Sequence, residues 1–258
     1  MSARVIAAAA ALAALGVTLD ARADGMTPDW RRADRRLRES PQSFAFEARI
    51  GPYRPQIDEE FSGGARPYEQ TFGDGRGLYF GFELDWQALR IPHLGTLGPG
   101  VSWGYSRRSA VAKVAEGPLA GQDSAQSTYL TIMPMYASAV LRVDMLSRDL
   151  GVPLVPYGKL GLGLGLWRAS TDNGLSTAPD GTVGKGRTWG THMALGGMFL
   201  LDFLDPSAAL GFDEELGVNN SYLFAEWQWL NLDGQVVEKG PQMHVGATGW
   251  IAGLALEF

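Results

Sequence analysis

The chain has no cysteine among its 258 residues and only three histidines. The absence of cysteine excludes a disulfide scaffold, a cysteine-based zinc site and an N-terminal cysteine that carries a lipid anchor. His93, His192 and His244 show neither an HExxH motif nor any other paired spacing. We therefore expect no metal centre and no cofactor.

Long apolar runs are also scarce. Beyond residue 23, no segment has the roughly 18 consecutive apolar residues that a membrane-spanning helix needs. The run VIAAAAALAALGV (residues 5–17) follows Arg4 and precedes Ala21, Arg22 and Ala23, which fit an A-x-A cleavage site. This order predicts a secretory signal peptide over residues 1–23, in preference to a buried alanine-rich helix.

Basic residues are the minority. Removing residues 1–23 takes Arg4, Arg22 and Asp20 from 22 basic and 28 acidic residues, which leaves 20 and 27 and a net charge near −7. This balance argues against nucleic acid as a partner. Residues 24–42 contain a run of arginines among acids and are predicted to form a periplasmic N-terminal segment, helical or disordered. A solvated charge run is favoured over a contact with lipid phosphates.

Glycine is abundant at 34 residues, and aromatic residues make up 10% of the chain. Apolar and polar residues alternate along eight segments, which is the pattern of strands with two unlike faces. The segments are residues 43–50, 78–87, 101–107, 129–145, 154–167, 189–203, 222–232 and 243–258. Most of them are at least as long as the about nine to eleven residues that a tilted membrane strand needs. We predict an all-β fold: a single eight-stranded antiparallel up-and-down transmembrane β-barrel over residues 43–258, with N and C termini periplasmic.

The connections between these segments alternate in character. The mostly long and polar set comprises residues 52–76, 108–126, 170–187 and 233–240. The generally shorter set comprises residues 89–98, 147–152 and 204–219, the last of which is predicted to hold a small helix. Because outer-membrane barrels have longer outer loops and shorter periplasmic turns, we assign the first set to the cell surface.

Alternation alone is equally compatible with a soluble secreted β-barrel, in which the apolar face is the core. Three features favour a membrane barrel, whose apolar face meets lipid. Aromatic residues near strand ends are typical of interfacial girdles: Trp86, Trp103, Trp167, Trp189, Tyr129 and Tyr222. Charges on the polar face predict a structural lumen network of Glu47, Arg49, Glu83, Asp85, Arg142, Asp144, Lys159 and Glu226. The last segment predicts a signal for the barrel-assembly machinery, formed by Trp250, Leu254, Leu256 and Phe258.

Four segments carry a resemblance to a known family: GPYRPQIDEEF (51–61), PYEQTFGDGRGLYFGFELDW (67–86), TIMPMYASAVLRVDML (131–146) and PYGKLGLGLGLW (156–167). The chain resembles a myxobacterial family of uncharacterised outer-membrane β-barrel proteins. The likeness covers nearly the whole chain after residue 23. It implies the barrel fold and an outer-membrane location, and it supplies no activity and no catalytic residues.

Candidate chemistry is sparse. GLGLGL (161–166) differs from the G-x-G-x-x-G of dinucleotide sites, because its glycines recur at every second residue of a predicted strand. One alternative is a lipid-modifying enzyme that combines His192 with Asp202 and with Ser102 or Ser106, but no local motif links these residues. We favour a hydrogen-bonded lumen histidine. Acid/base work by the lumen carboxylates is another alternative, and a paired plug is favoured because unpaired buried charge is costly.

The expected function is that of a monomeric outer-membrane barrel with a plugged lumen and a structural or surface-interaction role. Its expected partners are outer-membrane lipids and, during biogenesis, the barrel-assembly machinery. We expect no enzymatic activity. A narrow channel or carrier for small solutes or hydrophobic molecules is the main alternative, since eight strands leave room for little more than side chains.

Overall fold

The computed structural model describes residues 43–113, 123–177, 181–204, 216–234 and 243–258. The predicted signal peptide and N-terminal segment (residues 1–42) lie outside the described residues. Ten strands form one sheet, and two of them, β3 (Leu89–Ile91) and β7 (Gly174–Leu175), are short. The eight long strands are β1 (Phe44–Tyr53), β2 (Gly77–Trp86), β4 (Gly95–Lys113), β5 (Asp123–Arg142), β6 (Leu154–Thr171), β8 (Lys185–Leu200), β9 (Asn220–Asn231) and β10 (Ala247–Glu257).

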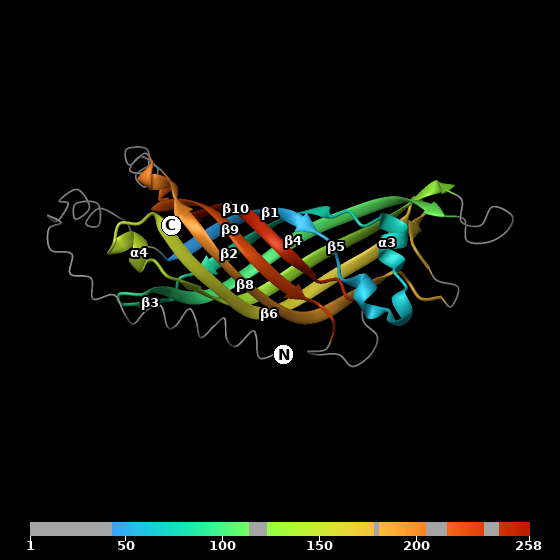
Figure 1. Cartoon of the computed structure of the whole chain (residues 1–258), viewed down its shortest axis with the longest axis horizontal. Coiled ribbons are helices and arrows are strands. Elements are labelled where there is room, and N and C mark those ends of the chain that lie inside the picture. The colour runs from blue at the N-terminus through green and yellow to red at the C-terminus, as the bar shows by residue number, and fades with distance from the viewer. Residues whose placement is uncertain (1–42, 114–122, 178–180, 205–215, 235–242) are drawn as a thin grey trace. The chain divides into compact units, whose positions relative to one another are not determined.

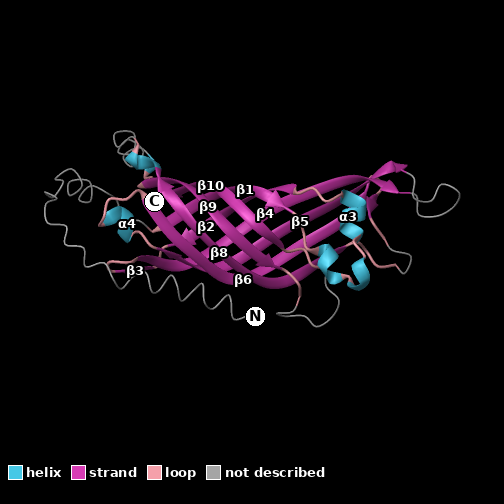
Figure 2. Ribbon diagram, in the orientation of Figure 1, coloured by secondary structure: helices cyan, strands magenta, loops and turns pink. Residues whose placement is uncertain are grey.

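These eight strands close into a barrel (Figures 1 and 2). Each pairs antiparallel with the next long strand in the chain, and β1 pairs with β10 to complete the ring. Near the middle of β1, Ala48 lies opposite Phe82 on β2 and Leu254 on β10. A closed ring has no unpaired strand edge, so the wall satisfies its own backbone groups. The predicted eight-stranded, up-and-down barrel is confirmed.

One end of the barrel holds the first and last described residues. The Ser43 and Phe44 amides donate to the Phe258 carbonyl oxygen (3.1 and 2.8 Å). We call this the terminal end, and it also carries α4 (Met145–Arg148) and η3 (Leu201–Phe203). The opposite end, the cap end, carries η1 (Ile57–Glu60), η2 (Ser62–Gly64) and α3 (Pro67–Phe72), to the right in Figure 1. No helix in the described part of the chain is both long and apolar enough to cross a membrane.

The predicted strand boundaries differ most from the observed ones at two strands. The third strand was expected over residues 101–107, with a connection over 108–126, but β4 extends to Lys113 and pairs with β5 as far as Asp123. Alternation identifies a strand only while one face is apolar, and beyond Tyr105 both faces of β4 become largely polar. The fourth strand was expected to reach Met145, but β5 ends at Arg142, where the chain turns toward α4.

The leucine–glycine repeat lies in β6. Leu160 and Leu162 are exposed on the outer wall, whereas Gly163 is buried inside the barrel. A Cβ atom at Gly161 would lie 2.0 Å from the Ala137 carbonyl oxygen, and one at Gly163 would lie 2.8 Å from Leu232 Cδ2. Glycine is therefore needed at position 161, where the neighbour is backbone, whereas a side chain at position 163 would require the Leu232 side chain to shift.

The half of the interior toward the cap end is filled by apolar and aromatic side chains. They come from the barrel strands, from the segment that precedes β10 and from the cap. The buried members include Tyr53, Ile57, Tyr68, Tyr79, Leu130, Ile132, Leu230, Leu232 and Val245. Side chains packed in this way occupy the space that a wider barrel would leave for water.

Candidate functional site

Charged side chains converge inside the half of the barrel toward the terminal end. They occupy alternate positions of six strands, because successive residues of a strand point to opposite faces. We call them the lumen cluster: Glu47, Arg49, Glu83, Asp85, Arg142, Lys159, Glu226 and Glu257. Each is at most 6% exposed.

Arg49 and Lys159 form the centre of the lumen cluster. The Arg49 guanidinium contacts Glu83 and Glu226, and its Nη1 lies 2.8 Å from Glu47 Oε2. The Lys159 ammonium lies 2.8 Å from Glu47 Oε2 and 2.9 Å from Glu83 Oε2. Two cations thus hold three carboxylates from different strands, and each carboxylate has a partner where water is excluded.

Arg142 extends the lumen cluster toward the terminal end. Its guanidinium lies 2.9 Å from Glu47 Oε1 and 3.0 Å from Glu257 Oε1, and it also contacts Asp85. The guanidinium fork suits such multiple contacts, because its donors are planar and fixed in direction. Glu47 therefore links Arg142 to Lys159 and Arg49, which makes the cluster one connected network.

Tyrosine hydroxyls donate further hydrogen bonds to three of the carboxylates. They donate from Tyr136 to Glu83 (2.9 Å), from Tyr157 to Glu226 (2.8 Å) and from Tyr222 to Glu257 (2.8 Å). The cluster contains five carboxylates against three cations, so these neutral donors supply hydrogen bonds that the cations do not. A side-chain network of this kind fixes the positions of the strands that contribute to it.

The predicted network and the observed cluster differ at Asp144. The other seven predicted residues lie in the cluster, but Asp144 follows the end of β5 and contacts Arg90 at 2.7 Å, near the surface. The alternation that placed it inside stops with the strand. Glu257, which the alternation also places on the polar face of the last segment, joins the observed cluster through Arg142.

His192 is fully buried beside the cluster. Its Nδ1 lies 2.7 Å from Ser138 Oγ, and its ring stacks on Tyr136 with centroids 3.6 Å apart. The acid considered for a catalytic set, Asp202, lies in η3 and accepts hydrogen bonds from Ser221 instead. The structure therefore does not assemble the Ser–His–acid combination that the sequence left open, and Ser138 is a partner that no local motif indicated.

The outer wall of the barrel is apolar. Side chains exposed there include Leu78, Phe80, Phe82, Val101, Leu160, Leu162, Leu195, Leu223, Leu254 and Leu256. Within the described strands, outward-facing positions carry no charge from the terminal end until the rim of the cap end. An exposed apolar surface of this extent is unfavourable in contact with water.

The predicted aromatic girdles are partly right. Trp86 is 53% exposed on the outer wall at the terminal end, whereas Trp103, although 39% exposed, lies opposite Phe82 near the middle of the wall and away from both rims. Trp167 and Tyr222 were placed in the girdles wrongly. Tyr222 is buried on Glu257, and Trp167 packs against the interior cluster with its ring beside Gly186. Both residues occupy inward positions of their strands. Strand direction therefore decides where their side chains lie, and the preference of aromatic residues for interfaces does not.

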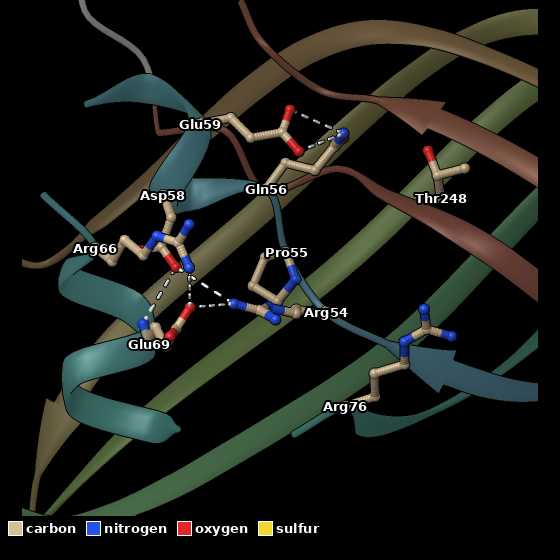
Figure 3. A pocket seen from close by; sticks show the side chains of 9 residues that line it. All are labelled: Arg54, Pro55, Gln56, Asp58, Glu59, Arg66, Glu69, Arg76 and Thr248. Atoms are coloured by element: carbon tan, nitrogen blue, oxygen red, sulfur yellow. Dashed lines mark hydrogen bonds and ion pairs between the residues drawn. The ribbon is translucent and has the colours of Figure 1, made fainter. Parts of the chain in front are cut away.

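The cap end has a hollow of about 410 Å³ (Figure 3). Glu69 stands between two arginines there, 3.0 Å from both Arg54 and Arg66. Their hydrogen bonds lower the pKa of Glu69. Asp58 accepts hydrogen bonds from the amides of Tyr68 and Glu69 (2.8 and 3.2 Å), which joins η1 to the start of α3. The hollow is lined by about as many acidic as basic side chains, and several of them pair with each other. We therefore interpret it as a surface feature of the cap that salt bridges hold together.

The chain thus combines a closed wall, an apolar outer surface and a charged, hydrogen-bonded interior. This polarity is the reverse of a soluble barrel, and it defines the fold of the outer-membrane β-barrel proteins.

The comparisons with solved structures find barrels of this class. The attachment invasion locus protein of Yersinia pestis is 14% identical, with 85% of this chain and 99% of that one covered and a TM-score of 0.43. Neisserial surface protein A is 16% identical, with 84% and 95% covered and a TM-score of 0.37. A major outer membrane protein from Thermus thermophilus is 11% identical, with 85% and 100% covered and a TM-score of 0.42. Because these sequence identities and TM-scores are low, the fold is assigned from the strand pairing of this chain alone. No family model and no curated protein matches.

Proposed function

We propose that this chain is a monomeric integral protein of the outer membrane whose barrel is sealed and holds the cap at the cell surface. The observation that carries the proposal is the lumen cluster. Charged side chains fill this half of the interior and contact one another, while the wall around them is apolar. A barrel built in this way is anchored by its wall and closed to solutes by its interior. It acts as a structural or surface-interaction protein and has no enzymatic role.

The proposal also covers orientation and biogenesis. The terminal end lies in the periplasm and the cap end outside, because the cap is the longest elaboration described between two strands. The wall contacts outer-membrane lipids. Trp250, Leu254 and Leu256 on the outer face of β10, together with Phe258 directly after it, form the assembly signal read by the barrel-assembly machinery. We assign the chain to the myxobacterial barrel family that its four segments resemble.

Membrane fractionation and conductance test the proposal together. The protein is expected in the outer-membrane fraction, to migrate differently on a denaturing gel before and after heating, and to give no steady conductance steps in planar bilayers. A porin of known conductance, reconstituted in the same bilayers, serves as the positive control. Recovery of the wild type in the soluble fraction would contradict membrane insertion, and steady steps from the folded wild type would establish the channel alternative.

A further inference from the structure

The first charged residues on the outer wall form a compact basic patch at the cap-end rim. On β4 the outward positions run Val101, Trp103, Tyr105 and then Arg107. On β6, Leu160, Leu162, Leu164 and Leu166 precede Arg168 in the same manner. On β8, Trp189 lies just below Arg187 and Lys185. Arg107, Arg168 and Lys185 are exposed, and we call these three residues the rim patch.

Strand register brings the rim patch together. Arg107 lies opposite Thr131 on β5, and Thr131 lies opposite Arg168 on β6. Arg168 in turn lies opposite Lys185 on β8. Neighbouring strands are about 4.8 Å apart, so Arg107 and Arg168 are separated by roughly 10 Å. Long cationic side chains at these spacings reach a common ligand.

Two like charges stand directly opposite each other within the patch. Arg168 and Lys185 are register partners on the same outward face, and such a pair is destabilising unless a counter-charge relieves it. The outward positions of β4, β5, β6 and β8 between the patch and the terminal end carry no carboxylate in the described strands. The nearby Asp172 carboxylate accepts from the Ser127 amide (2.6 Å) and the Tyr129 hydroxyl (3.0 Å). The geometry thus calls for an external anion.

Other contacts hold the patch at a membrane interface. The Arg107 guanidinium lies over the Tyr129 ring, 4.4 Å from its centroid, which fixes the side chain against the wall. The apolar belt of Tyr105, Leu166 and Trp189 ends directly below. Where a bilayer surrounds such a belt, its rim lies at the depth of the lipid headgroups.

We propose that the rim patch binds the phosphate groups of anionic glycolipid headgroups in the leaflet around the cap end. Guanidinium forks match phosphate oxygens bidentately, and several cations spaced over β4, β6 and β8 suit a headgroup with more than one phosphate. This assignment rests on the proposed membrane location. It names the lipid chemistry that the barrel selects and the residues that select it.

The test measures binding of diphosphoryl lipid A to the folded protein in phosphatidylcholine nanodiscs. The patch variant carries Arg107→Gln, Arg168→Gln and Lys185→Gln. Its matched control carries Arg66→Gln, Arg90→Gln and Arg148→Gln, which removes the same charge elsewhere. The patch variant is expected to bind lipid A about tenfold or more weakly than wild type, and the control to bind within about twofold.

Three results would overturn the assignment. Equal losses in the two variants would reduce the effect to net charge, and unchanged binding in the patch variant would place the lipid elsewhere. Full competition by millimolar inorganic phosphate would identify a free-anion site instead of a lipid site. Each variant is first shown to insert and to migrate heat-modifiably, so a failure of the membrane location is seen separately, before any lipid is added.

Discussion

Replacing Arg49 by methionine is expected to lower the free energy of unfolding by about 3–5 kcal/mol, the cost of leaving buried carboxylates without their cation. Arg49 contacts Glu47, Glu83 and Glu226, and its side chain is fully buried. Methionine has a similar length but supplies neither charge nor donors. Glu47 keeps Lys159 and Arg142, but Glu83 and Glu226 keep only Lys159 among the cations of the lumen cluster, and their repulsion strains β2 and β9.

The measurement is urea unfolding of the refolded protein in lipid vesicles, followed by heat-modifiable migration. Arg49→Lys is the matched control, because it keeps the charge and loses the fork, so its cost should be clearly smaller. Adding Glu83→Gln to Arg49→Met should recover part of the loss, since one uncompensated charge is removed. Equal stability of Arg49→Met and wild type would mean that the cluster is solvated and that the lumen is not sealed.

A positive charge in the middle of the outer wall should be nearly as costly. Leu162 faces outward on β6 and is 52% exposed, with apolar neighbours toward both ends of its strand. Leu162→Arg is expected to destabilise the barrel by about 2–4 kcal/mol, the cost of arginine near a bilayer midplane. Leu166→Arg, on the same face beside the rim residue Arg168 and opposite Arg187, should cost only about 0–1 kcal/mol for its depth and about a further 0.2–1 kcal/mol for repulsion by these like charges.

The difference between the two losses of unfolding free energy is a better test than either loss alone. Both changes are Leu→Arg on one face of one strand, so side-chain volume and strand propensity are matched. Unfolding in phosphatidylcholine vesicles gives the difference directly. Equal and small costs at both positions would mean that this wall faces water, as in a soluble barrel.

Much of the fold is predictable because one physical rule acts along the whole wall. Alternation places Glu47, Arg49 and Glu83 on one face and Phe46 and Phe82 on the other, whatever solvent lies on each side. The strand count and the inward charges therefore follow from the sequence. The rule fails in the extension of β4, because neither face is apolar there. It also fails beyond the end of β5, because the strand has stopped, and Asp144 therefore lies outside the lumen.

Other features of the site depend on which strands become neighbours. Ser138 on β5 and His192 on β8 are not register partners, and they meet only because Gly161 on β6 leaves room between them. No local pattern encodes such a contact. Trp167 and Tyr222 show a different error. They were assigned to the interfaces because they are aromatic, although the alternation of their strands places both side chains inside the barrel. The rim patch likewise appears only when the registers of four strands are combined.

Tryptophan quenching by lipids brominated along their acyl chains tests most directly whether the apolar wall meets lipid. Two proteins would each keep one tryptophan, Trp103 on the outer wall or Trp167 inside, with the other seven of the chain's 8 replaced by phenylalanine. Brominated chains are expected to quench Trp103 strongly and to leave Trp167 nearly unaffected. If Trp103 is instead quenched by aqueous iodide and not by brominated lipid, the wall does not lie in a membrane.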